Sequence, residues 1–358
     1  MHKAWWVVAL LVVFVGAFGA WWYFTDIRVE KRNQAAPTTL TRSNPTVIKA
    51  VLDHGGENLE ALATTEKTAI QALGANTIYV YLEYEYVDGT FALAAPFRGR
   101  SATTAEEQYR ELIKKIKEAG FAVHLAIAFG GGQNKPFAVP IEQLLNDAEA
   151  ADIKWASIAE ELKVESYAPS SEIDYQIFRE YYGQDWTDQA KHDEAAQKSN
   201  EYHDRVLPKL RQVFKGKLIF QAGLYSQKLC SKGYDIFGTG LNSVSREVSN
   251  FAELATQVFG YAENNAQCSG SEWMLTEFWV PYLENDGTPD GGAAMKTPNG
   301  VNYAEIQDGL YQIGTDAYLN WSGELKPVGF GFTSWQQATA RVKDTAAAEV
   351  IRSFFAKI

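Results

Sequence analysis

The stretch AEEQYRELIKKIKEAGFAVHLAIAF (105–129) joins a predicted helix to a predicted strand. In its first part, 105–120, apolar residues recur three and four positions apart, and Gly120 is placed as a C-terminal stop. Its second part, 121–129, is an apolar run of strand length. A helix that leads directly into a buried strand is the repeating unit of a parallel sheet, so this stretch predicts an α/β fold.

The same alternation continues on both sides of this stretch. A second amphipathic helix is predicted at 251–265, and seven more apolar runs are predicted strands, at 47–53, 76–84, 164–168, 217–223, 234–240, 272–279 and 328–335. Eight strands, each followed by a helix or a short connection, indicate a closed (β/α)8 TIM barrel, which typically needs about 250 residues. The span 46–358 holds 313 residues. A doubly wound open sheet is the alternative, but no G-x-G-x-x-G follows the first strand.

An uncharged run, AWWVVALLVVFVGAFGAWWYF, occupies residues 4–24. It is long enough to cross a hydrocarbon core of about 30 Å as a single helix, and Trp residues lie at both of its ends. We expect residues 1–32 to be an N-terminal membrane anchor with its flanks, a cleaved signal peptide being the alternative. Residues 33–45, rich in Thr, Ala, Pro and Ser, are a predicted flexible tether, and 46–358 is the predicted catalytic domain.

The charge of the chain is concentrated after the N-terminal segment. The net charge is −11, and residues 1–35 contribute +2, which leaves −11 − 2 = −13 for the rest. Nucleic-acid binding rests on Lys and Arg that neutralise phosphates, so an acidic body argues against a nucleic-acid partner. There is no H-E-x-x-H, no G-x-S-x-G and no Walker-type loop, and we expect neither a metal nor a cofactor.

Two smaller features leave alternatives open. Cys230 and Cys268 could form a disulfide or remain two separate buried thiols. His192 and His203 fall on a polar helical stretch, where we expect both to be solvated.

In a TIM barrel the chemistry lies at the carboxyl ends of the strands. Carboxylate, amide and aromatic side chains dominate the predicted strand ends. Such groups are expected around a carbohydrate, whose hydroxyls need hydrogen-bond partners and whose C–H faces lie against aromatic rings. The candidate substrate-binding residues are His54, Glu83, Glu85, Ser171, Tyr225, Asn242, Trp279 and Trp335, and Gln221 is a further candidate to bind substrate or orient a carboxylate.

Two carboxylates stand apart from the others. Glu172 ends the fourth predicted strand and Glu277 ends the seventh, so they can face each other across a substrate. A retaining glycosidase needs one protonated and one ionised carboxyl group about 5–5.5 Å apart, the first as acid and then base, the second as nucleophile. We therefore predict Glu172 and Glu277 as the catalytic pair.

A Glu closing strand four, a Glu closing strand seven and a Trp ending strand eight resemble the arrangement of clan A glycoside hydrolases. These "4/7" barrel enzymes include endo-mannanases and endo-galactanases. The resemblance implies Glu172 as acid/base, Glu277 as nucleophile and Trp335 as a sugar-stacking platform. One position departs from the pattern, because the clan usually has Asn before the acid/base and this chain has Ser171. Family-113-type mannanases also tolerate another residue there, so the departure weakens the subfamily assignment more than the clan assignment.

The expected activity is that of a retaining β-glycoside hydrolase on a polysaccharide or oligosaccharide, such as a β-mannan. A non-catalytic carbohydrate-binding barrel and a cell-envelope transglycosylase are the alternatives. Polymeric β-glycans lie outside the cytoplasm, so we expect an extracytoplasmic, monomeric catalytic domain, secreted if the N-terminal segment is cleaved. The basic flank of Arg28, Lys31 and Arg32 favours the opposite orientation.

Overall fold

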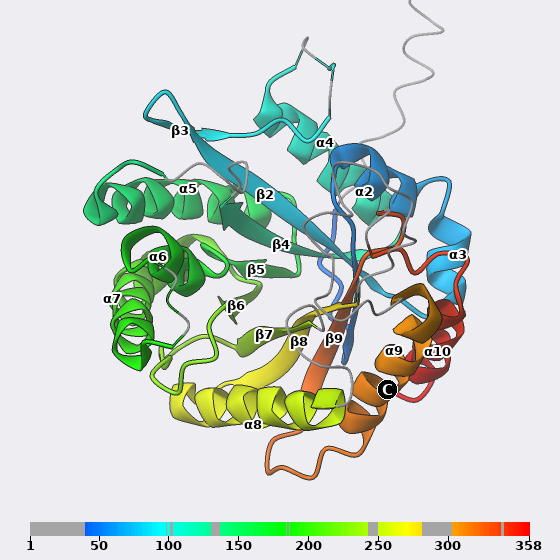
Figure 1. The fold of residues 1–358 in the computed structure, drawn as a ribbon. Coiled ribbons are helices and arrows are strands. Elements are labelled where there is room, and N and C mark those ends of the chain that lie inside the picture. Colours follow the sequence, from blue (N-terminus) through cyan, green and yellow to red (C-terminus); the bar gives the residue numbers. More distant parts are fainter. Residues whose placement is uncertain are drawn as a thin grey trace, which may run out of the picture. The chain divides into compact units, whose positions relative to one another are not determined.

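Eight parallel strands close into a barrel in a computed structural model of the chain (Figure 1). The structure describes residues 40–97, 99–100, 103–129, 137–183, 185, 187–242, 250–280, 303–337 and 340–358. The strand order is β1-β9-β8-β7-β6-β5-β4-β2, and a parallel pairing of β1 with β2 closes the ring. This confirms the predicted (β/α)8 barrel and excludes the open sheet.

All eight predicted strands are present. The strands are β1 Ile48–Leu52, β2 Thr77–Val87, β4 Ala122–Phe129, β5 Ser166–Ala168, β6 Lys217–Ala222, β7 Ile236–Asn242, β8 Glu272–Trp279 and β9 Pro327–Thr333. An additional short strand, β3 (Thr90–Leu93), pairs antiparallel with the outer end of β2. β2 and β3 together form a hairpin that extends beyond the wall of the barrel.

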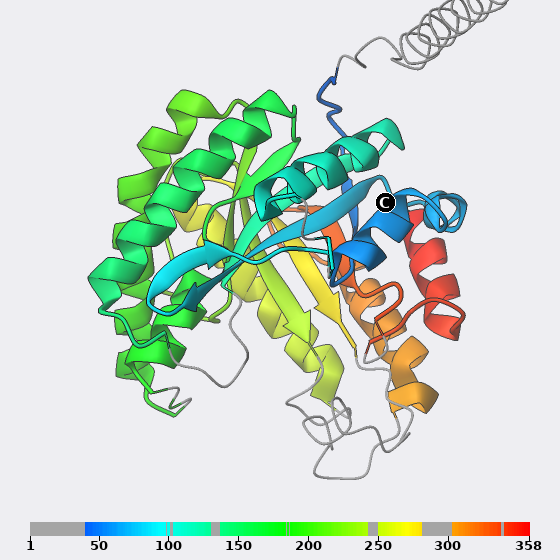
Figure 2. The same cartoon turned by 90° about the horizontal axis from the view of Figure 1, so that it is seen from above.

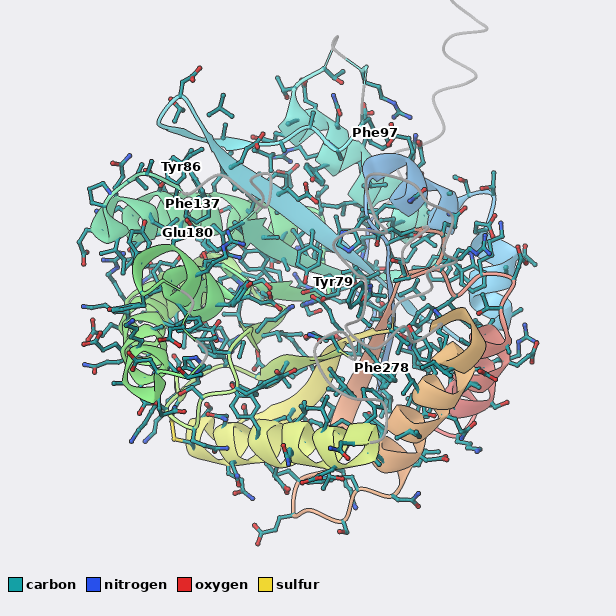
Figure 3. The ribbon with its side chains drawn as sticks, viewed as in Figure 1. Tyr79, Tyr86, Phe97, Phe137, Glu180 and Phe278 are labelled. Carbon is teal, nitrogen blue, oxygen red and sulfur yellow. A yellow bond between two sulfur atoms is a disulfide. The ribbon has the colours of Figure 1, made fainter. Side chains whose placement is uncertain are left out.

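Helices surround the strands on the outside of the barrel (Figure 2). They are α2 Gly56–Ala63, α3 Lys67–Ala72, α4 Ala105–Glu118, α5 Ile141–Glu161, α6 Ile173–Tyr181, α7 Gln189–Val213, α8 Phe251–Ser269, α9 Tyr303–Leu319 and α10 Ala346–Phe355. Aromatic side chains fill the layer between helices and sheet. Phe278 of β8, for example, packs against Phe251 and Tyr311 (Figure 3).

The stretch 105–129 folds as predicted, for local reasons. Thr104 and Glu107 form a capping box at the start of α4, which satisfies backbone N–H groups that have no partner within the helix. The helix ends at Glu118, just before Gly120, and buries its apolar stripe, which includes Leu112 and Ile116. β4 then pairs in parallel with β2 and β5.

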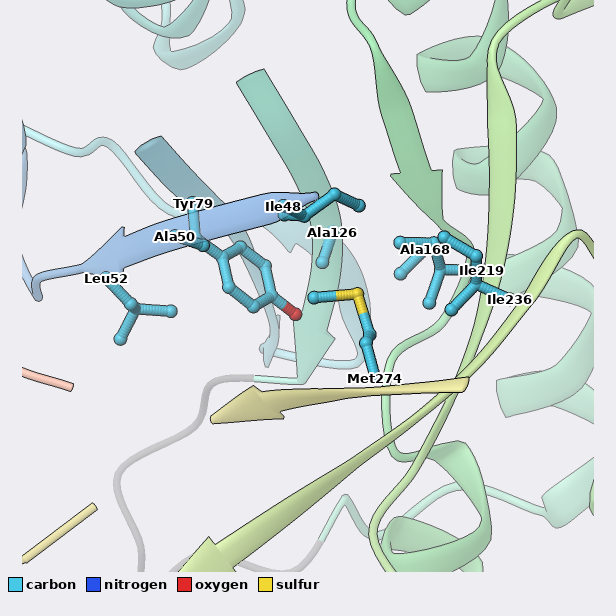
Figure 4. Packing of buried hydrophobic residues seen from close by; sticks show 9 residues of the cluster. All are labelled: Ile48, Ala50, Leu52, Tyr79, Ala126, Ala168, Ile219, Ile236 and Met274. Atoms are coloured by element: carbon cyan, nitrogen blue, oxygen red, sulfur yellow. The ribbon is translucent and has the colours of Figure 1, made fainter. Parts of the chain in front are cut away.

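The interior of the barrel is filled by inward-facing side chains of alternate strand positions (Figure 4). Small residues leave room for two large ones, Tyr79 and Met274, near the centre. The cluster consists of Ile48, Ala50, Leu52, Tyr79, Ala126, Ala168, Ile219, Ile236 and Met274. The barrel is therefore a packed core, and chemistry is confined to its carboxyl-terminal end.

The amino-terminal end of the barrel is held by charged groups. The carboxylate of Glu165 pairs with Lys117 at 2.6 Å and accepts a hydrogen bond from the backbone N–H of Ser43 at 2.8 Å. Arg42 donates to the Val164 carbonyl at 2.7 Å. These contacts fix the segment that leads into β1.

The described residues decide two expectations from the sequence and bear on a third. Cys230 and Cys268 form a disulfide that joins the β6–β7 connection to the end of α8. The expectation that His203 is solvated is wrong, because α7 packs its inner face on the sheet and His203 lies wholly buried against Phe220. His192 is half-buried and packs edge-on against Phe178.

The predicted membrane-spanning run, 4–24, and most of the predicted tether lie outside the described residues. Within the described part of the chain, no helix combines the length and the apolar character that crossing a bilayer requires. The segment Thr41–Ile358 forms one compact unit.

Candidate active site

Glu172 lies in the turn between β5 and α6, where the backbone adopts an unusual conformation. Ser170 and Glu172 have φ angles of 39° and 57°, in the left-handed region that residues other than glycine rarely occupy. The turn is tied to both neighbouring strands, because Ser171 N–H donates to the Ile127 carbonyl at 2.7 Å and Glu172 N–H donates to the Gln221 carbonyl at 2.9 Å. These bonds direct the Glu172 backbone toward β6.

A buried carboxylate behind the turn stabilises this conformation. Asp152 of α5 is fully buried and accepts hydrogen bonds from the backbone N–H of Ser170 at 3.0 Å and from its hydroxyl at 2.6 Å. The hydroxyls of Tyr167 and Tyr202 donate to the same carboxylate, at 2.7 Å and 2.5 Å. These hydrogen bonds hold the backbone of the turn in a strained conformation that would otherwise relax.

Glu277 lies on β8, and a local irregularity of that strand decides where it points. Thr239 of β7 pairs with Leu275, but the next residue, Gly240, pairs with Glu277, so Thr276 is an extra residue. A bulge of this kind reverses the alternation of side chains beyond it. Met274 faces the interior before the bulge, and Glu277 faces it after the bulge.

Glycines on both neighbouring strands make room for the bulge. A Cβ atom on Gly331 of β9 would lie 2.2 Å from the Thr276 carbonyl oxygen, and one on Gly238 of β7 would lie 2.5 Å from the Thr276 methyl group. Neither distance is compatible with van der Waals contact, so both positions require glycine for the strand to adopt this shape.

Two neutral donors hold the Glu277 carboxylate. Its Oε1 atom accepts hydrogen bonds from the hydroxyl of Tyr81 and from Nε2 of Gln221, the latter at 3.0 Å. Tyr79 lies one inward position below Tyr81 on β2 and donates to Oε1 of Gln221. After burial, the negative charges of Glu277 and Glu172 are the main causes that raise the pKa of Tyr79. Glu172 is also bonded through its backbone N–H to the Gln221 carbonyl, so the predicted pair is linked through one residue of β6.

The two carboxyl groups are raised in pKa alike but differ in their hydrogen-bond partners. Burial, together with the negative charge of Asp174, raises the pKa of Glu172 to about 7, and burial raises the pKa of Glu277 to about 7. Donors to Glu277 favour its charged form, whereas the described residues offer no hydrogen-bond donor to the Glu172 carboxyl. With both pKa values near neutrality the two groups can share one proton at neutral pH, and the donors from Tyr81 and Gln221 favour leaving the negative charge on Glu277.

Several predicted binding residues lie on the same surface. His54 stacks on Tyr81 with ring centroids 6.3 Å apart, and burial lowers the pKa of His54, which favours the neutral ring. Trp279 follows Glu277 by two positions on β8 and is half-buried. Glu83 and Glu85 follow Tyr79 and Tyr81 on the same face of β2, toward the end of the strand that forms the hairpin. Ser171 is buried directly before Glu172.

The remaining predicted residues lie at the periphery. Tyr225 is 40% exposed, and its hydroxyl donates to the Gly240 carbonyl at 2.8 Å. Asn242 is exposed at the end of β7. Trp335 is only 5% exposed and donates its indole N–H to Glu66 at 3.0 Å. Its sugar-stacking role stays a prediction, and little of the ring is left for a sugar.

Four residues of the site were not predicted. Tyr79 and Tyr81 could have been found from the alternation along 76–84, which places them on the same face as Glu83. Asp152 and Asp174 lie on helices, and nothing in their sequence surroundings marks them as partners of a strand end. Among the described residues, no group of three His, Cys, Asp or Glu side chains is arranged to hold a metal ion.

Comparison with known proteins identifies similar folds. No protein-family model matches the chain, and a search of curated proteins finds no match. A GH113 beta-1,4-mannanase superposes with a TM-score of 0.61 at 13% identity. The match covers 88% of this chain and 100% of the mannanase. The hyperthermostable endo-1,4-beta-D-mannanase from Thermotoga petrophila RKU-1 gives 0.59 at 12% identity, with coverage of 88% and 100%.

A larger enzyme shares the same barrel. The beta-D-glucuronidase of Dictyoglomus thermophilum superposes with a TM-score of 0.57 at 11% identity, covering 88% of this chain and 51% of that one. At such identities the likeness shows the fold. The predicted resemblance to glycoside hydrolase barrels, including family-113 mannanases, is therefore confirmed at the level of the fold.

Proposed function

We propose that the chain is a retaining β-glycoside hydrolase of clan A, with Glu172 as acid/base and Glu277 as nucleophile. The observation that carries the proposal is the unequal hydrogen bonding of two carboxyl groups at the carboxyl end of one barrel, with two donors to Glu277 and none from the described residues to Glu172. Pairs of carboxyl groups whose surroundings favour opposite protonation states are typical of acid/base assignments in glycosidases. The barrels of mannanases and a glucuronidase, similar in fold, support the same class of reaction.

The proposed reaction has two displacement steps. In the first, the Glu277 carboxylate attacks the anomeric carbon while the glycosidic C–O bond breaks, and Glu172 transfers its proton to the leaving oxygen. In the second, ionised Glu172 takes a proton from water, whose oxygen attacks the anomeric carbon and releases Glu277. Each step inverts the anomeric centre, so the net configuration is retained.

The substrate we propose is a β-linked polysaccharide or oligosaccharide, with β-mannan as the first candidate. His54, Glu83, Glu85, Ser171 and Trp279 would contact the sugar nearest the carboxylates. Tyr225 and Asn242 would act at the periphery of the site. Hydrogen-bonding carboxylates and imidazole beside a half-exposed indole suit the hydroxyls and the C–H faces of a sugar. No cofactor, metal or nucleic acid takes part, and the catalytic domain acts as a monomer.

We also propose that the catalytic domain works outside the cytoplasm, held by the N-terminal segment or released after its cleavage. The Cys230–Cys268 disulfide supports an oxidising compartment. A reporter enzyme that is active only outside the cytoplasm should therefore give a signal when it is fused to the C-terminus. A cytoplasmic reporter signal would contradict extracellular polysaccharide as the substrate.

The test is product analysis on a panel of β-glycans that includes mannan, galactan and glucan. We expect shortened or monomeric sugars from at least one polymer and none with Glu277→Gln, which should still bind that polymer. Longer products, with a sugar in place of water as acceptor, would identify a transglycosylase. Binding without any turnover in the unaltered chain would identify a carbohydrate-binding barrel and overturn the proposal.

A further inference from the structure

Gln221, near the end of β6, contacts both carboxylate-bearing residues. Its backbone carbonyl accepts the hydrogen bond from Glu172 N–H at 2.9 Å, and its side-chain Nε2 donates to Oε1 of Glu277 at 3.0 Å. The residue is 1% exposed. One buried strand residue therefore reaches the turn of the proposed acid with its main chain and the proposed nucleophile with its side chain.

The orientation of the Gln221 amide is determined by its neighbours. Tyr79 donates its hydroxyl to Oε1, which leaves Nε2 to donate to Glu277 and to the Tyr81 hydroxyl at 3.1 Å. A flipped amide would place its oxygen against the Glu277 carboxylate, which is unfavourable because both are acceptors. Tyr79 cannot move away easily, since it is buried in the barrel interior beside Met274 (Figure 4).

We infer that Gln221 is a positioning residue that sets Glu172 and Glu277 relative to each other. The inference rests on the proposed function, in which the separation of the two carboxyl groups decides between retaining and inverting chemistry. β6 suits this task because it is paired on both sides, with β5 and β7. β6 is a regular strand that lies between the strained turn of Glu172 and the bulged strand of Glu277. Both are thus tied to the same fixed strand.

The two links differ in how they respond to mutation. A side-chain substitution at Gln221 removes the donor to Glu277 and leaves the carbonyl bonded to Glu172 N–H. We therefore test the inference with Gln221→Leu, which has a similar size and no amide. Gln221→Glu is the second variant; it keeps an acceptor for Tyr79 but replaces the donor beside Glu277 with a negative charge.

The main measurement is the titration of the Glu277 carboxyl by NMR of 13C-labelled chains. The donor favours the charged form, so its loss in Gln221→Leu should raise the pKa of Glu277, and Gln221→Glu should raise it further. In the active enzyme the acidic limb of the pH–rate profile should move to higher pH in the same order. We expect kcat to fall by about 100-fold, as for a reacting group that is misplaced by roughly 1 Å.

Gln108→Leu is the matched control. Gln108 of α4 is also a buried glutamine, 2% exposed, and its amide donates to the Arg100 carbonyl at 2.8 Å. It should lower the melting temperature without changing the Glu277 titration or the pH–rate profile. If Gln221→Leu and Gln221→Glu behave like Gln108→Leu, with lower stability and an unchanged pKa of Glu277, the inference is wrong.

The design separates this inference from the proposed function. The NMR titration needs no substrate, so it reports on Gln221 even if the chain hydrolyses no glycan. An inactive chain in which Glu277 still responds to Gln221→Leu would contradict the hydrolase and support the contact. An active hydrolase whose Glu277 does not respond would contradict the role of Gln221 alone.

Discussion

The turn that carries Glu172 and the strand that carries Glu277 place the same type of side chain at the same end of the barrel by opposite means. The turn has left-handed residues, a neighbouring negative charge and no donor to the Glu172 carboxyl among the described residues. The strand has extended backbone, a single bulge and two neutral donors to Glu277. The difference teaches that the protonation state of a carboxyl group is set by its partners as well as by its burial.

The two regions also carry different structural costs. Left-handed conformations at residues other than glycine cost about 1–3 kcal/mol each, and the turn has two of them, Ser170 and Glu172. Asp152 offsets that cost with bonds to Ser170. The strand instead depends on the absence of side chains at Gly238 and Gly331. Each region should therefore fail in its own way when it is changed.

The largest expected effect comes from removing the proposed nucleophile. Glu277→Ala should lower kcat by a factor on the order of 10⁴ or more, because the first displacement loses its attacking group. Added azide should restore turnover and give a glycosyl azide of inverted anomeric configuration, which NMR can identify. Glu272→Gln, at the opposite end of the same strand and paired with Lys217 at 3.4 Å, is the control and should stay near the unaltered rate.

An azide product of retained configuration from Glu277→Ala would reverse the roles assigned to the two carboxyl groups. It would mean that Glu277 acts as the acid/base and that the donors from Tyr81 and Gln221 serve another purpose.

Removing the proposed acid should have a smaller, substrate-dependent effect. With Glu172→Gln, we expect kcat to fall by about 10²–10⁴ on natural glycans, where the leaving oxygen needs a proton. The loss should be much smaller on dinitrophenyl glycosides, whose leaving group departs without protonation. The basic limb of the pH–rate profile should disappear, because Glu172 no longer titrates. Equal losses on both substrates would show that Glu172 is not the acid.

A smaller loss is expected from filling the space beside the bulge. Gly331→Ala places a Cβ atom 2.2 Å from the Thr276 carbonyl oxygen, so the bulge must shift and Glu277 must move with it. We expect kcat to fall by about 10- to 100-fold through misplacement of the carboxylate. Gly309→Ala on α9, where the space is open, is the control. An unchanged rate in Gly331→Ala would mean that the bulge does not orient Glu277.

The last expected effect concerns stability rather than rate. The pKa of Glu172 is about 7 against an ordinary value of 4.5, so the folded chain binds this proton more tightly than the unfolded chain does. Its stabilising contribution is therefore complete below pH 4.5 and is lost as the pH rises toward 7. A shift of this size corresponds to up to about 3 kcal/mol.

Glu172→Gln should accordingly raise the free energy of unfolding at pH 8 and leave it almost unchanged at pH 4. Because burial raises the pKa of Glu277 to about 7 as well, Glu277→Gln should show a comparable gain at pH 8 and almost none at pH 4. Urea denaturation of both variants at the two pH values measures the difference. A larger gain for Glu277→Gln would contradict the assignment of the proton to Glu172.

The sequence predicts the barrel well, because each strand and helix has a local signal. The capping box, apolar stripe and strand of 105–129 lie within 26 residues, from Thr104 to Phe129. β3 was missed because TFAL is short and pairs only with the projecting end of β2. His203 was misplaced because the burial of its helix face depends on packing against Phe220.

The site was predictable only in part. Glu172 and Glu277 were found because strand ends meet at one face of a barrel. Simple alternation along 272–279 would turn Glu277 away from the interior, and only the bulge at Thr276 corrects this. The donors from Tyr81 and Gln221 come from strands that neighbour neither β8 nor each other, so their contact with Glu277 exists only once the barrel has closed.

The most direct test is covalent trapping of the proposed glycosyl-enzyme. The chain is treated with a panel of 2-deoxy-2-fluoro-β-glycosyl fluorides, including the mannosyl compound, and the labelled peptide is identified by mass spectrometry. The second displacement is slowed by the fluorine, so the sugar should accumulate as an ester on Glu277 and be absent from Glu277→Gln. A sugar bound to Glu172, or to any residue other than Glu277, would contradict the roles proposed for the pair.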